Sequence, residues 1–127
     1  MAGAGPPERG TGKPPPRPIR LSGNRDLIIQ VECTAGAVVL HPTRLRIPTT
    51  ALTPRGDANP LVQAVRQMIT RRQASVRPGE TPYRPQVRFL VRPDGLRAFH
   101  LAYPALEALR LPMTRQDIGW GEEVRTP

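Results

Sequence analysis

The clearest change of hydrophobic pattern lies in the last third of the chain. Residues 87–91 (VRFLV) are mostly β-branched or aromatic, which is typical of a strand that buries at least one face. After a Pro93-Asp94-Gly95 turn, apolar residues recur every three or four positions, which predicts a helix over residues 97–110 packed against that strand. We expect Asp94 to cap this helix and Gly95 to supply any positive φ that the reversal needs.

Pro104 leaves a second interpretation of this region open. A proline inside a helix loses one hydrogen bond and clashes with the preceding turn. Asp-Gly between two apolar runs is also a strong hairpin signal. Residues 96–101 could therefore form a strand paired with residues 87–91, with a helix beginning only at Pro104. We favour the single helix.

The first folded segment predicts a hairpin and an edge strand. Residues 27–33 and 37–40 are apolar runs separated by a short turn, in which Gly36 could adopt a positive φ. His41-Pro42 ends the second strand, because proline cannot donate to a ladder. Residues 43–49 alternate basic and apolar side chains, which suits a half-exposed edge strand whose charges discourage edge-to-edge pairing.

The middle of the chain predicts a second helix. Asn59 is a good N-cap residue, and Pro60 suits the first helical position. Apolar residues then form one stripe at helical spacing. They are Leu61, Val62, Val65, Met68 and Ile69. Arg66, Arg71 and Arg72 are candidates for binding an anion, although a solvated helix face is the simpler interpretation.

These elements predict a small α+β domain. We expect a two-layer sandwich in which four to five strands carry two helices on one face, with residues 113–120 as a last short strand. The domain would span residues 25–120, between a leader at 1–24 and a flexible polar tail at 121–127.

The leader is rich in proline, glycine and arginine and is predicted to be disordered. Residues 1–23 contain six prolines and five glycines and almost no large apolar residues, so they cannot bury enough surface to offset the entropy of ordering. Within the leader, Pro15, Pro18 and Arg20 fit a PxxPxR pattern that aromatic grooves recognise as a polyproline helix. A plain solvated leader is the alternative.

The charge favours anionic partners but does not identify one. The net charge of +9 arises from 18 arginines and one lysine against ten carboxylates. Such a balance is typical of proteins that bind nucleic acid or acidic surfaces. The arginines are scattered along every segment, however, and few aromatic residues are present for base stacking. Nucleic-acid binding is therefore the alternative function and not the leading one.

Catalytic and metal-binding patterns are absent from the sequence. One cysteine, Cys33, excludes an internal disulfide and suits a small buried apolar position. The two histidines, His41 and His100, lack metal-ligand spacing and an obvious carboxylate partner, and we expect His100 in the core or at its boundary. Asp94 is more simply a turn residue than a general acid. We expect no enzyme activity and no cofactor, and a cytoplasmic protein without a membrane span.

The order of elements resembles a known family. A hairpin, a helix, a buried strand, an Asp-bearing turn, a second helix and a short closing strand make the chain similar to the periplasmic domain of the ExbD/TolR biopolymer-transport family. The segments that carry this resemblance are residues 26–40, 59–72 and 86–118. The chain also resembles a group of uncharacterised bacterial proteins with an ECxAxxVVLHP run, here residues 32–42, and an LVRPDG run, here residues 90–95.

The resemblance implies a role in binding and not in transport. Members of the ExbD/TolR family are anchored by one membrane helix that carries an essential aspartate, and this sequence contains neither. Proton-driven coupling therefore does not carry over. What the resemblance implies is a small non-catalytic domain that forms homodimers or binds other proteins, for example through its sheet edges.

Overall fold

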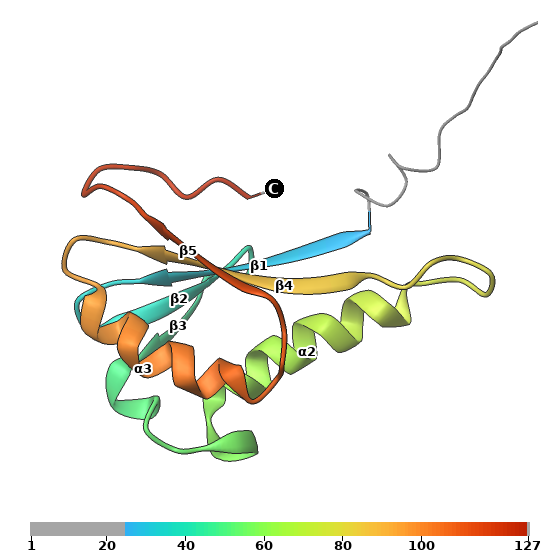
Figure 1. Ribbon diagram of the computed structural model, residues 1–127, viewed down its shortest axis with the longest axis horizontal. Coiled ribbons are helices and arrows are strands. Elements are labelled where there is room, and N and C mark those ends of the chain that lie inside the picture. The colour runs from blue at the N-terminus through green and yellow to red at the C-terminus, as the bar shows by residue number, and fades with distance from the viewer. Residues whose placement is uncertain (1–24, 127) are drawn as a thin grey trace, which may run out of the picture.

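A computed structural model describes residues 25–126 as one sheet covered by helices on a single face (Figure 1). The leader, with the Pro15, Pro18 and Arg20 pattern, lies outside the described residues. The elements follow in the order β1 (Asp26–Cys33), β2 (Ala37–His41), β3 (Leu45–Pro48), η1 (Thr49–Ala51), η2 (Gly56–Ala58), α2 (Pro60–Ala74), β4 (Arg84–Val91), α3 (Leu96–Glu107) and β5 (Met113–Asp117). The α+β sandwich predicted from the sequence is confirmed, with five strands and two α-helices.

The five strands form a mixed sheet in the order β3-β2-β1-β4-β5. The β1–β2 and β2–β3 pairs are antiparallel hairpin pairs. The β1–β4 and β4–β5 pairs are parallel, and each needs a crossover connection that contains a helix. Both helices lie on the same side of the sheet, whereas the C-terminal segment after β5 returns across the opposite side (Figure 1).

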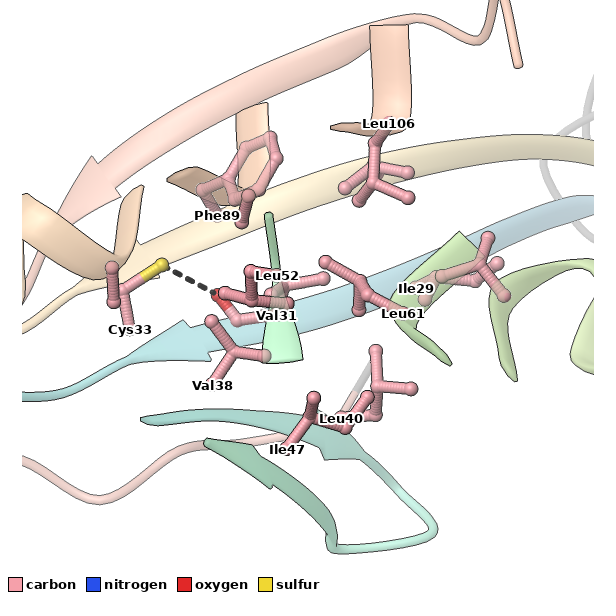
Figure 2. Packing of buried hydrophobic residues seen from close by; sticks show 14 of the residues in the cluster. Ile29, Val31, Cys33, Val38, Leu40, Ile47, Leu52, Leu61, Phe89 and Leu106 are labelled. Carbon is pink, nitrogen blue, oxygen red and sulfur yellow. Dashed lines mark hydrogen bonds between the residues drawn. The ribbon is translucent and has the colours of Figure 1, made fainter. Parts of the chain in front are cut away.

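The core lies between the sheet and the two helices. On β1, every second side chain from Leu27 to Cys33 is buried on the helix-covered face, and β4 contributes Val87, Phe89 and Val91 in the same way. Leu61 of α2 and Leu106 of α3 belong to the same cluster, and Figure 2 shows them beside Ile29, Val31 and Phe89. Cys33 is fully buried in this cluster, as the sequence predicts.

Helix α2 begins where the capping pattern places it. The Asn59 side chain accepts a hydrogen bond from the Leu61 backbone N–H at 2.9 Å. Its Nδ2 also donates to the carbonyl oxygens of Leu52 and Pro54, so this fully buried amide fixes the preceding loop as well as the helix. All of its polar atoms therefore have partners, as burial requires.

Helix α3 settles the alternative that Pro104 left open. Residues 96–101 are helical and not a strand, and the helix continues through Pro104 to Glu107. Ala98, Ala102 and Leu106 are buried at four-residue intervals against the sheet, so tertiary packing outweighs the local cost of proline.

The turn before α3 differs from the prediction in two respects. Gly95, and not Asp94, occupies the N-cap position, and no side chain caps the helix there. Gly95 also has a φ of −100°, so positive φ is not the reason for this glycine. A Cβ at this position would instead overlap the backbone carbonyl of Cys33 at the end of β1. Glycine is required because the turn approaches the central strand so closely.

Gly36 provides a matched comparison for this constraint. It does not adopt the positive φ considered for it, and an added Cβ there would meet no atom within 4 Å.

We predict that Gly95→Ala destabilises the protein because the added methyl group must displace the backbone of β1 or of the turn. The expected loss in free energy of unfolding is about 2–3 kcal/mol, measured by urea denaturation. Gly36→Ala is the control and should change the free energy of unfolding by less than about 0.5 kcal/mol. Equal stabilities of the two variants would contradict this explanation of Gly95.

Candidate functional site

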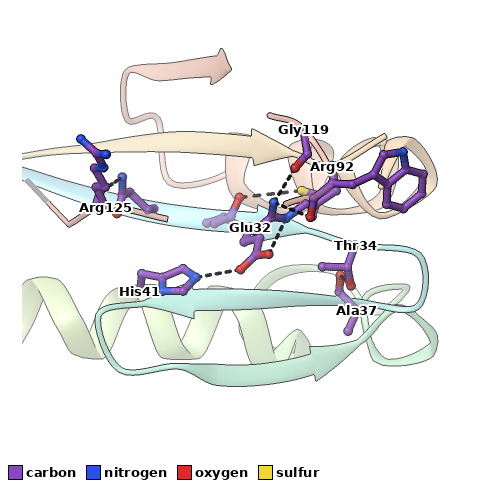
Figure 3. Close-up of polar contacts among 11 residues, drawn as sticks. Glu32, Thr34, Ala37, His41, Arg92, Gly119 and Arg125 are labelled. Atoms are coloured by element: carbon purple, nitrogen blue, oxygen red, sulfur yellow. Dashed lines mark hydrogen bonds and ion pairs between the residues drawn. The ribbon is translucent and has the colours of Figure 1, made fainter. Parts of the chain in front are cut away.

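Polar side chains of the central strands gather on the face of the sheet that no helix covers. Successive strand residues alternate between the two faces of a sheet. Gln30 and Glu32 therefore lie on the face of β1 that is turned away from its core residues. His41 at the end of β2 and Arg92 just after β4 share this face with them (Figure 3). Three of these four residues, Gln30, Glu32 and His41, belong to largely apolar strands, in which a polar side chain needs a local partner.

Glu32, His41 and Arg92 form a connected network. Oε1 of Glu32 lies 2.9 Å from Nε2 of His41. Oε2 of Glu32 accepts a hydrogen bond from Nε of Arg92 at 2.8 Å. Arg92 Nη1 also donates to the carbonyl oxygen of Gly119 at 2.6 Å (Figure 3). The network thus joins β1, β2 and β4 to the segment after β5.

The environment keeps Glu32 ionised. Burial raises the pKa of this carboxyl, but the hydrogen bonds from His41 and Arg92 and their positive charge outweigh burial, so its pKa lies below the ordinary 4.5. Both carboxylate oxygens are already engaged, and the two partners are largely buried beside it. This arrangement is suited to holding strands together and does not resemble a general acid or base poised near neutral pH.

Cys33 lies directly after Glu32 in the chain and has no such polar environment. Its side chain is completely buried, and burial together with the neighbouring Glu32 charge raises the pKa of the thiol to about 12. The thiol therefore stays protonated and unreactive at physiological pH. Within residues 25–126, no group of three or more His, Cys, Asp or Glu side chains could hold a metal ion.

Two interpretations of the histidines made from the sequence are wrong. His41 does have a carboxylate partner, Glu32, which the hairpin register brings diagonally opposite on the same face. His100 is exposed on α3 and not in the core or at its boundary, although its ring contacts that of Phe99. Glu32 is a charged residue inside the apolar run of β1, and this is the feature of the sequence from which a buried polar network could have been predicted.

The three arginines suggested for anion binding do not meet at one point. Arg66 pairs with Asp57 at 3.4 Å, and the Arg72 guanidinium lies over the Tyr83 ring, 5.3 Å from its centre. Arg71 lines two cavities, one of about 660 Å³ that Arg72 also lines, and one of about 440 Å³ at the β3 edge that Arg44 and Arg46 also line. Arg44 and Arg46 lie far from Arg71 in the sequence, so the helical pattern of α2 alone does not predict that they share a cavity.

The two edges of the sheet differ in how well they are protected. β3 is a short edge strand of four residues that ends at Pro48, and its Arg46 is exposed. β5 is five residues long with no proline inside it, and the residues after Met113 are all exposed. Short strands and strands that contain proline resist pairing with other chains, so β5, which is longer and has no proline within it, is the edge better able to accept another strand.

Aromatic side chains of α3 lie beside β5. Phe99 and Tyr103 contact each other with ring centres 5.6 Å apart, and the Arg115 guanidinium of β5 lies 4.8 Å from the centre of the Phe99 ring. Tyr103 remains more than a third exposed. The β5 edge is therefore accompanied by an aromatic and cationic surface that a bound chain could contact.

We predict that Glu32→Gln removes an acid-sensitive part of the stability. Near neutral pH the variant should lose about 2 kcal/mol, because the charge-assisted hydrogen bonds to His41 and Arg92 are weakened. The folded pKa of Glu32 is lowered, so the wild-type advantage is fully present above pH 4.5 and is lost as the pH falls through that lowered pKa.

The measurement is urea unfolding of both proteins at a series of pH values. Glu107→Gln, on the exposed side of α3, is the control and should match the wild type throughout. A stability difference between Glu32→Gln and wild type that stays constant down to strongly acidic pH would contradict the role given to the network.

Comparisons with known proteins leave the chain without an assigned relative. No family model, no curated protein and no solved structure matches it. The resemblance to the ExbD/TolR periplasmic domain therefore stays a prediction from the order of elements. Within residues 25–126, neither α-helix has the length and apolar character needed to cross a bilayer.

Proposed function

We propose that this domain is a non-catalytic protein-interaction module that accepts an extended strand of a partner, or of a second copy, along β5. The observation that carries the proposal is the exposed β5 edge, which has no proline inside it, beside the aromatic residues of α3. Main-chain hydrogen bonds along such an edge supply affinity, and neighbouring side chains supply specificity. A small domain of this kind is also what the ExbD/TolR resemblance implies.

The backbone of β5 defines which groups would meet the added strand. The carbonyl oxygen of Pro112 accepts a hydrogen bond from Val87, and the N–H of Ile118 donates to Val91. Even-numbered residues of β5 therefore direct their backbone groups toward β4, whereas residues 113, 115 and 117 direct theirs away from it. Arg115 lies at the centre of this outward row.

We predict that Arg115→Pro prevents docking at β5, because proline removes the central outward N–H without removing a hydrogen bond to β4. Peptides that bind the wild-type protein would first be selected from a displayed library. Their affinities for the wild type and for the variants would then be compared by titration. We expect at least about a tenfold loss for Arg115→Pro, from one lost hydrogen bond and the clash of the ring.

Arg115→Ala is the matched control, since it also removes the guanidinium from Phe99 but keeps the N–H. It should retain binding within about a factor of three, which corresponds to less than 1 kcal/mol. The same pair of variants, compared by sedimentation equilibrium, tests a homodimer. Peptides that bind Arg115→Pro as well as wild type, or a selection and a mass measurement that both yield nothing, would refute docking at β5.

A second candidate function is binding to nucleic acid. The observation that favours it is the meeting of Arg44, Arg46 and Arg71 around one cavity at the β3 edge. None of the three forms an ion pair within residues 25–126, so their charges are available to phosphates.

We predict for this second candidate that duplex and single-stranded probes bind at low salt with a logarithmic salt slope of about −2 to −3, as three phosphate contacts require. Replacing Arg44, Arg46 and Arg71 together by glutamine should abolish binding. Replacing Arg55, Arg77 and Arg97, which lie on other exposed surfaces, makes the same charge change and should not. A flat titration at low salt would eliminate this function.

A further inference from the structure

A cavity lies on the helix-free face of the sheet, between the strands and the segment after β5. Its volume is about 510 Å³, within the range of small-ligand sites. Gln30 of β1 and Arg88 of β4 line it from the sheet, and Glu123 and Val124 line it from the C-terminal segment. We call this space the tail-side cavity.

Gln30 is the first indication of a ligand in the tail-side cavity. Its side chain is only 4% exposed, and its Nε2 donates to the carbonyl oxygen of Arg125 at 2.8 Å, which fixes the orientation of the amide. Its Oε1 is buried and has no hydrogen-bond donor within residues 25–126. A buried carbonyl without a donor costs about 1–3 kcal/mol, so an N–H group from outside would stabilise it.

Arg88 is the second indication. Gln30 and Arg88 are paired in the parallel β1–β4 register, so they lie side by side on adjacent strands about 4.8 Å apart and share one face. The Arg88 guanidinium forms no hydrogen bond or ion pair with any residue in 25–126. A half-buried free guanidinium is suited to a carboxylate, which it binds through two parallel hydrogen bonds.

The other residues that line the cavity indicate which further groups the ligand carries. Leu90 and Ile118 are buried and, with Val124, form an apolar part of the cavity. The Glu123 carboxylate forms no ion pair with any residue that the structure describes, so a positive charge could pair with it. Glu122 is different, because its carboxylate already accepts a hydrogen bond from Gly119 at 3.1 Å.

We propose that the tail-side cavity binds an α-amino-acid unit that has a free carboxylate and an aliphatic side chain. The carboxylate pairs with Arg88, the nitrogen on the same Cα donates to Gln30 Oε1, and the side chain lies against Leu90 and Ile118. One Cα holds a carboxylate and an N–H within a few ångströms, as the neighbouring Gln30 and Arg88 positions require. This site is independent of docking at β5.

Two sources supply this chemistry, a free amino acid and the C-terminal residue of a peptide. A free amino acid brings an ammonium group, which Glu123 would bind as well as Gln30. A peptide end brings an amide N–H, which satisfies Gln30 alone. The two sources therefore differ in their dependence on the charge of Glu123.

The experiment is a titration followed by the side-chain amide signals of Gln30 in NMR spectra of the isotope-labelled full chain. The probes are L-leucine, N-acetyl-L-leucine and L-leucinamide at up to millimolar concentrations. We expect L-leucine to shift the Gln30 signals in a saturable manner and L-leucinamide, which lacks the carboxylate, to bind at least about tenfold more weakly. Saturable binding of N-acetyl-L-leucine identifies a peptide end, and its failure identifies a free amino acid.

Variants make the assignment specific. Arg88→Gln should abolish the shifts, whereas Arg97→Gln, an equal change of charge on the exposed side of α3, should leave them intact. Glu123→Gln should weaken the binding of L-leucine only if the Glu123 carboxylate recognises its ammonium group. The proposal is overturned if no probe shifts the Gln30 signals. It is also overturned if L-leucinamide binds like L-leucine, or if Arg88→Gln binds like the wild type.

Discussion

The parallel pairing of β1 with β4 is the constraint on which the rest of this structure depends. The two strands pair along their whole lengths, from Asp26 beside Arg84 to Cys33 beside Val91, although more than fifty residues separate them in the chain. Their alternate side chains form most of the sheet side of the core. A parallel pair cannot be closed by a tight turn, so after β2 and β3 the chain has to leave the sheet, pass through α2 and return as β4.

That requirement also explains why both helices cover one face. The chain proceeds from β3 to β4 through α2 and from β4 to β5 through α3, and both steps move in the same direction across the sheet. Crossovers between parallel strands are right-handed almost without exception, so two steps in one direction place their helices on the same side. The opposite face is left to the segment after β5, which contacts the sheet through Arg92 and Gln30. The asymmetry of the two faces is a consequence of strand order.

The sequence predicts the elements well because each depends on neighbours in the chain. The Asn59 cap, the apolar stripe of α2 and the alternation in β1 and β4 are local patterns, and the structure agrees with them. The sequence fails where a residue is chosen by a distant one. Gly95 is explained by the carbonyl of Cys33, and the partners of Glu32 become visible only once the register of β1 against β2 and β4 is known. Arg44 and Arg46 meet Arg71 for the same reason, since β3 lies beside α2 only in the folded chain.

The strand order also limits what the resemblance to the ExbD/TolR domain implies about function. A hairpin followed by two right-handed crossovers gives two helices on one face whatever the protein does, so this likeness follows from chain connectivity and does not identify a function. Residues that the fold itself uses, such as Asn59, Gly95 and Glu32, are equally uninformative about function, because stability accounts for them. Within residues 25–126, the informative residues are those that the fold does not use: a guanidinium without a partner at Arg88, a buried carbonyl without a donor at Gln30, and the exposed edge strand β5. Each of them costs stability or invites unwanted association, so these are the residues on which the proposals of binding rest.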